Sequence, residues 1–99
     1  MGLDIVVYQK GGSKFFCEIP ESIHREMFGN GANSFPLTSM LHDYYRANVY
    51  LSGSEFSAWV DELDSIACKL SPCMKEALDD LVKKLKTCRN VEKVHVAGD

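Results

Sequence analysis

Apolar and polar residues alternate near both ends of the chain, with the period of two that is typical of β-strands. Leu3–Gln9 is a dense run of β-forming residues and predicts a central strand covered on both faces. Lys14–Ile19 resumes the alternation after Lys10-Gly11-Gly12-Ser13, whose glycines tolerate a positive φ, so the two runs predict a β-hairpin. Val91–Val96 predicts one more short strand.

Between these strands the apolar residues recur with the helical period of 3.6. Ser52-Gly53-Ser54-Glu55 matches the capping box and predicts the start of a helix over Ser54–Leu70. A second long helix, Pro72–Cys88, begins at Ser71-Pro72, because serine is a good N-cap and proline suits the first helical position. Trp59 stands at the centre of the first helix's apolar stripe, so we expect it to be largely buried.

Shorter elements fill the region before these helices. Pro20–Phe28 predicts a short helix, which Gly29-Asn30-Gly31 ends. Apolar residues on one helical stripe then predict a helix from position 37 to 45: Leu37, Met40, Leu41, Tyr44 and Tyr45. Asn48–Leu51 predicts a short extended piece.

The order of elements predicts an α+β fold. Strands are separated from a run of helices rather than alternating with them, which argues against a doubly wound fold. We expect a small sheet of three or four strands, built from the N-terminal hairpin and the C-terminal strand, with the two long amphipathic helices packed on one face. The 99 residues contain no linker or repeat, so they predict a single domain over residues 1–99.

Charge and hydropathy exclude two classes of partner. Eleven basic residues against fourteen acidic ones give a net charge of −3, the wrong sign for a protein that binds nucleic acid. No apolar run approaches the length of about 18 residues that spans a bilayer, so no membrane partner is expected. Leu3–Tyr8 is too short for a signal peptide and contains Asp4, so we expect a cytoplasmic protein with reduced thiols.

The cysteines and histidines do not form a metal or cofactor motif. Four residues rather than two separate Cys68 from Cys73, and the three histidines fall in three different elements. The glycine clusters match no phosphate-binding loop. We therefore expect no metal and no cofactor, with Cys17 and Cys88 packed as small hydrophobic residues and Cys68 on the polar side of its helix.

The acidic helix carries the strongest functional signal. Its four acidic residues and the single Lys69 give this segment the same net charge as the whole chain. Such a run is either a solvated surface that keeps the protein soluble or a surface complementary to a basic partner. Tyr44-Tyr45 adds aromatic bulk that belongs either to the core or, because tyrosine is common in interface hot spots, to a binding surface. The candidate partner-binding residues are Asp43, Tyr44, Asp61, Glu62 and Asp64.

Three blocks of the sequence resemble small bacterial proteins of the immunity type, which bind and neutralise a cognate toxin. They are Met1-Gly2-Leu3-Asp4 before the first strand, Phe35-Pro36-Leu37 with Asp43-Tyr44-Tyr45 before the acidic helix, and the final Val96-Ala97-Gly98-Asp99. The resemblance implies a non-enzymatic cytoplasmic inhibitor that acts by occlusion, often on a basic toxin domain. The acidic helix is consistent with such a partner.

Two alternatives stay open at this point. One is a small enzyme or regulatory protein, which requires a concave site where a histidine, a carboxylate and a cysteine converge. The other is homodimerisation through an exposed sheet edge formed by Val91–Val96.

Overall fold

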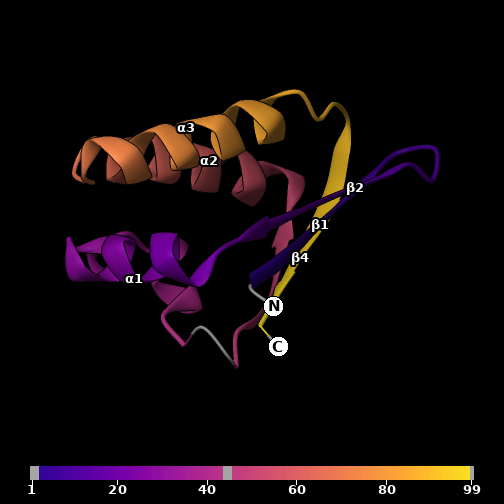
Figure 1. The fold of residues 1–99 in the computed structure, drawn as a ribbon. Helices are drawn as coiled ribbons and strands as arrows, with labels where there is room; N and C mark the ends of the chain where they lie inside the picture. Colours follow the sequence, from indigo (N-terminus) through magenta and orange to yellow (C-terminus); the bar gives the residue numbers. More distant parts are fainter. Residues whose placement is uncertain (1–2, 44–45, 99) are drawn as a thin grey trace.

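The computed structural model describes residues 3–43 and 46–98. Figure 1 shows the helices gathered on one side of a twisted sheet. The elements in chain order are β1 (Leu3–Gln9), β2 (Lys14–Ile19), α1 (Glu21–Gly29), the 3₁₀ turns η1 (Ala32–Ser34) and η2 (Thr38–Leu41), β3 (Asn48–Ser52), α2 (Gly53–Ala67), α3 (Pro72–Lys86) and β4 (Val91–Ala97).

The four strands form one antiparallel sheet in the order β2-β1-β4-β3. The predicted hairpin pairs Ile5 with Cys17, and β1 also pairs Ile5 with Val96 on its other side. The predicted extended piece becomes an edge strand, β3, in which Val49 pairs with Val96. The α+β fold, the central position of β1 and the two long helices are thus confirmed.

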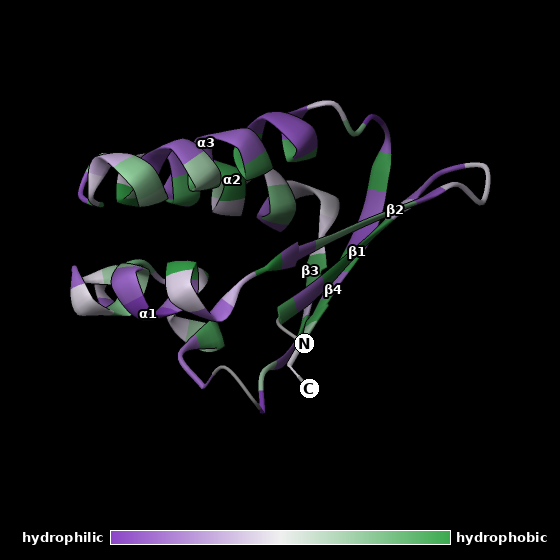
Figure 2. Ribbon diagram, viewed as in Figure 1, coloured by the Kyte–Doolittle hydropathy of each residue, from purple (hydrophilic) through white to green (hydrophobic). Residues whose placement is uncertain are grey.

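The hydrophobic core lies between the sheet and the helices. Leu3, Ile5 and Val7 are fully buried on the face of β1 that meets the helices. Figure 2 shows the hydrophobic stripes of α2 and α3 turned toward the interior of the fold. Trp59 on α2 is 0% exposed, so its predicted burial is confirmed.

The opposite face of β1 differs from its prediction. Val6 and Tyr8 are only half-buried, whereas a strand covered on both faces was expected. All three described helices lie on the other side of the sheet (Figure 1). The continuous apolar run of β1 therefore reflects one buried face and one apolar face open to solvent.

The position of β4 also differs from prediction. This strand lies between β1 and β3, and both neighbours pair with it over five or more residues. Its backbone groups are used on both sides, so Val91–Val96 offers no free edge, and the predicted mode of dimerisation is wrong. The edges of the described sheet are β2 and β3.

The helix expected from Leu37 to Tyr45 is wrong over the residues described. Only Thr38–Leu41 is helical, as a 3₁₀ turn, and Met40 on the expected apolar stripe is 45% exposed. Tyr44 and Tyr45 lie outside the described residues. So short a segment gains little from helical hydrogen bonds, and the backbone N–H groups of Leu37 and Thr38 donate to Glu62 on α2 instead.

The two long helices begin in different ways. At α2 the capping box is complete, because Glu55 N–H donates to Ser52 Oγ and Ser52 N–H donates to the Glu55 carboxylate. Ser71 occupies the N-cap of α3 as predicted, yet its hydroxyl makes no cap hydrogen bond. Its backbone N–H donates to Glu26 Oε1 on α1 at 2.5 Å.

Candidate partner-binding site

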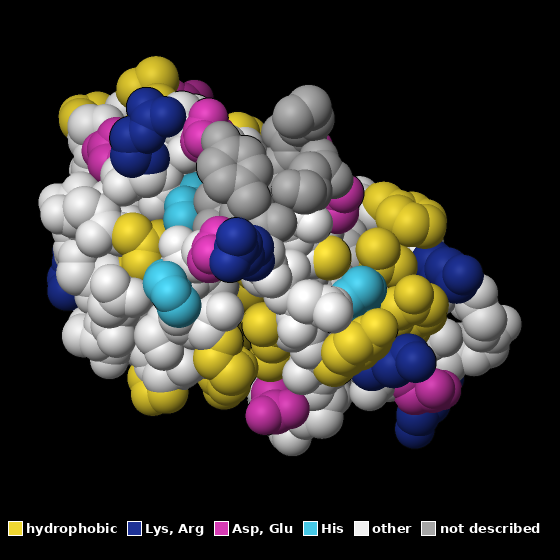
Figure 3. All heavy atoms as spheres, turned by 90° about the horizontal axis from the view of Figure 1, so that it is seen from below, with side chains coloured by type: hydrophobic (Ala, Val, Ile, Leu, Met, Phe, Trp, Pro, Cys, Tyr) yellow, Lys and Arg dark blue, Asp and Glu magenta, His cyan; other side chains and the backbone are white. Residues whose placement is uncertain are grey.

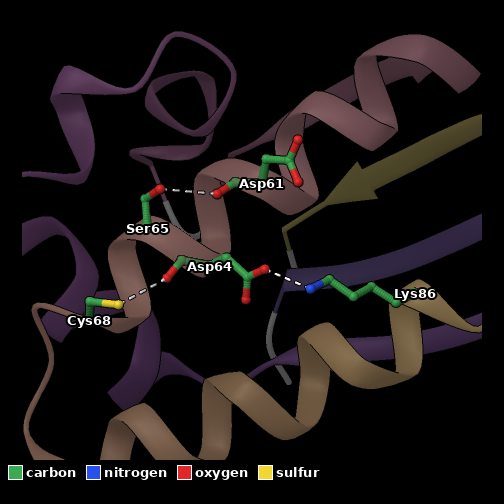
Figure 4. A network of polar contacts seen from close by, with 5 residues as sticks. All are labelled: Asp61, Asp64, Ser65, Cys68 and Lys86. Carbon is green, nitrogen blue, oxygen red and sulfur yellow. Dashed lines mark hydrogen bonds and ion pairs between the residues drawn. The ribbon is translucent and has the colours of Figure 1, made fainter.

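The three acidic candidates on α2 face three different surroundings. Asp64 lies toward α3, where its Oδ2 accepts a hydrogen bond from Lys86 Nζ at 2.7 Å (Figure 4). This bond raises the pKa of the Lys86 ammonium. The charge of Asp64 is therefore offset by a lysine of the next helix, an arrangement that counting charge along one helix misses.

The Asp61 side chain is open to solvent or a partner. Its side chain is exposed, and it forms no ion pair with any residue in 3–43 or 46–98. Its backbone carbonyl accepts a hydrogen bond from Ser65 Oγ at 3.2 Å, which leaves the carboxylate out of this local contact (Figure 4). Asp61 is thus the most available of the three acids.

A hollow of about 380 Å³ adjoins Asp61 between the first turns of α2, the last turns of α3 and the start of β4. Its lining mixes polar and apolar residues, among them Ser57 and Asn90 beside Phe56 and Val60, and the last two side chains are buried. Lys86 also borders the hollow, but its ammonium is held at Asp64. A hollow beside an available carboxylate has room for the long side chain of a lysine or arginine whose charged end meets the acid.

Glu62 lies on the other side of α2 and serves the loop before β3. Its Oε1 accepts hydrogen bonds from the N–H and the Oγ1 of Thr38, both at 2.9 Å, and its Oε2 accepts one from Leu37 N–H at 3.3 Å. Thr38 is fully buried. Glu62 was predicted to be a partner-binding acid, but the structure gives both of its oxygens a role in joining η2 to α2.

The Asp43-Tyr44 step is described only in part. Asp43 Oδ1 accepts a hydrogen bond from Arg46 N–H at 3.1 Å, close to the start of β3. Tyr44 lies outside the described residues.

The histidines and thiols do not converge in one cleft of the described chain. His24 is buried and bonds the carbonyl of Leu41 at 2.8 Å, whereas His95 stacks on Tyr50 on the far side of the sheet. Burial, with a contribution from nearby Cys88, raises the pKa of the Cys17 thiol to about 12 despite the opposing effect of Lys84. Burial raises the pKa of the Cys88 thiol as well. Both thiols are thus held in the protonated, weakly nucleophilic form at neutral pH.

Neither a metal site nor a known relative accounts for these residues. In the described parts of the chain, no three His, Cys, Asp or Glu side chains cluster closely enough to bind a metal ion. Nor does any described helix have the length and hydropathy to cross a membrane. Comparisons with protein-family models, curated proteins and solved structures each find no match to this chain.

Proposed function

We propose that this protein is a non-enzymatic protein-binding module of the immunity type, which neutralises a cognate basic toxin domain in the cytoplasm by covering its active surface. The observation that carries the proposal is Asp61, an exposed carboxylate without an ion pair in the described chain, beside a hollow of about 380 Å³. The three sequence blocks that resemble immunity-type proteins supply the class of partner.

The binding mode follows from the surroundings of Asp61. A lysine or arginine of the partner enters the hollow and places its charge at the Asp61 carboxylate. Clustered complementary charge speeds association and rejects partners of the wrong sign. The ammonium of Lys86 offsets the charge of Asp64, so Asp64 adds less than Asp61 to the local negative potential.

Charge reversal at Asp61 tests this site. Wild-type protein, Asp61→Lys and the matched control Asp80→Lys, an equally charged change at an exposed site on α3, serve as baits in an extract of the source cells. We expect one basic protein to be retained by the wild type and the control and lost by Asp61→Lys. With that protein purified, the Asp61→Lys variant should associate more slowly, and the dependence of its rate on salt should be flatter.

Two outcomes contradict separate parts of the proposal. Equal association rates and equal salt dependence for wild type and Asp61→Lys exclude Asp61 as the anchor. The immunity-type function requires that the captured protein arrests the growth of cells expressing it alone and that co-expression of the wild type restores growth. A captured protein without this toxicity contradicts that function, whatever the effect of Asp61→Lys.

A further inference from the structure

The face of the sheet that the helices leave open has an aromatic centre. Alternate residues of the four strands point to this face and form three rows across the sheet, as the strand register shows. The middle row contains Phe16, Val6, His95 and Tyr50, in the order β2, β1, β4, β3. Phe16 is 67% exposed and Tyr50 is 62% exposed. Figure 3 shows hydrophobic side chains gathered on this side of the molecule, with basic side chains beside them.

The row nearer the hairpin loop is basic. It contains Lys14, Tyr8, Lys93 and Ser52. The ammonium groups of Lys14 and Lys93 lie 5.3 Å and 5.0 Å from the centroid of the Tyr8 ring, so two cations flank one aromatic side chain.

The row on the other side of the aromatic centre is acidic. It contains Glu18, Asp4, Ala97 and Asn48. The open face is therefore basic at one end, apolar in the middle and acidic at the other end. A surface with this order is complementary to itself once it is reversed along the strand direction.

We propose that the open face binds a second copy of this chain, sheet against sheet, about a two-fold axis that follows the middle row. An axis parallel to the strands would place the basic row against the basic row of the other copy, with Lys14 opposite Ser52 and no acid facing either lysine. The axis along the middle row instead places Lys14 opposite Glu18 of the second copy, and Tyr8 opposite Asp4 of the second copy. Because a two-fold interface repeats each contact, both pairings form twice.

The area of the open face gives the expected range of the dimer's affinity. Four strands about 4.8 Å apart and three rows about 7 Å apart give a plan area on the order of 400 Å². A standard interface takes about 800 Å² of accessible surface from each partner. The dimer is therefore of modest affinity, and we expect a Kd on the order of 1–100 μM. The hollow beside Asp61 lies in the helical layer, so the dimer leaves the proposed toxin-binding surface open.

Two charge reversals, measured apart and together, test this geometry by sedimentation equilibrium over a range of protein concentrations. Lys14→Glu alone and Glu18→Lys alone each set like charges against each other twice, and each should raise the dimer Kd at least about tenfold. In an equimolar mixture, the Lys14→Glu variant carries acids at positions 14 and 18, and the Glu18→Lys variant carries lysines at both. A heterodimer of the two therefore has opposite charges in both of its facing pairs. Its Kd should return to within about threefold of the wild-type value.

Further variants distinguish this dimer from association through another surface. Lys83→Glu, the same charge change at an exposed position on α3, should leave the Kd unchanged. Tyr50→Lys should weaken the dimer by at least about tenfold, because it places two cations near the axis on β3. Pairing of β2 edges also sets Lys14 opposite Glu18 of the second copy but leaves Tyr50 three strands away. A wild type that stays monomeric up to about 1 mM, a mixture that fails to associate, or a Tyr50→Lys dimer of unchanged Kd would overturn the proposal.

Discussion

Glu62 on α2 holds the buried Thr38 through two hydrogen bonds of 2.9 Å, one from the threonine N–H and one from its hydroxyl. With the third bond from Leu37 N–H, one carboxylate accepts hydrogen bonds from three donors of this loop. This contact fixes the segment before β3 against the helical layer, since η2 makes no long helix of its own.

Removal of this carboxylate should destabilise the fold. Glu62→Ala leaves the buried donors of Thr38 unpaired, so we expect the free energy of unfolding to fall by about 1–3 kcal/mol in chemical denaturation. Glu76→Ala, at an exposed position on α3, should change it by less than about 0.5 kcal/mol. Equal effects of the two substitutions would show that the Glu62 contacts contribute nothing to stability.

Two glycines in different surroundings should respond differently to alanine. A Cβ at Gly53, the first residue of α2, would clash with the backbone carbonyl oxygen of Val91, so Gly53→Ala should cost about 1–3 kcal/mol of stability. At Gly29 a Cβ meets nothing within 4 Å, so Gly29→Ala should be neutral or slightly stabilising. Thermal melting of both variants measures the difference, and a Gly53→Ala protein as stable as wild type would contradict the close approach of α2 to β4.

The two N-cap serines give a matched pair. Ser52→Ala removes the hydroxyl that accepts from Glu55 N–H and should cost about 1 kcal/mol of stability. Ser71→Ala removes a hydroxyl without a cap hydrogen bond, so its cost should be clearly smaller. Denaturant titration compares the two variants, and the reverse order would mean that the cap of α3 forms in solution.

The thiols should fall into two kinetic classes. Cys68 and Cys73 are exposed, whereas burial raises the pKa of Cys17 and Cys88. An aromatic disulfide reagent at pH 8 should therefore modify two thiols quickly and two slowly in the native protein, and all four at similar rates after unfolding. A Cys68→Ser/Cys73→Ser variant should retain only the slow class. Rapid modification of Cys17 in the native state would contradict its burial.

The same thiol makes stability depend on alkaline pH. The pKa of Cys17 is about 12 in the folded protein against an ordinary value of 9.0, so above pH 9 the unfolded chain loses this proton more readily than the folded one. The contribution of Cys17 to stability is thus complete below about pH 9 and is lost as the pH rises toward 12. Unfolding measured from pH 8 to pH 10.5 should show a shallower decline for Cys17→Ala than for wild type, and parallel curves would contradict the shift.

Local signals in the sequence predicted the secondary structure well, because their causes are local. The capping box at Ser52 and the apolar stripe around Trp59 depend on residues a few positions apart, and both are present in α2. The order of the strands in the sheet, in contrast, has no local cause in the sequence. Alternation tells which residues of Val91–Val96 share a face, but not that β4 inserts between β1 and β3.

The candidate site likewise has some features that local sequence patterns predict and others that they do not. The helical period correctly left Asp61 on an exposed side of α2. The partners of Asp64 and Glu62 lie on α3 and η2, at least 22 residues away in the sequence, so no pattern within α2 reveals them. Charge summed along one helix therefore overstated the acidity of the surface that the folded protein presents.

The interior position of β4 also governs when the protein can fold during its synthesis. β4 is the last of the described elements to leave the ribosome, yet it supplies the only strand-to-strand link between the β1–β2 hairpin and β3 in this sheet. About 45 residues separate the end of β3 from the end of β4, and at about 5–20 residues per second their synthesis takes several seconds. During this interval the nascent chain holds a hairpin and a separate strand with unpaired edges. If synthesis stops before Val91, the truncated chain keeps these strand edges unpaired. Chaperones or other chains can then bind to them.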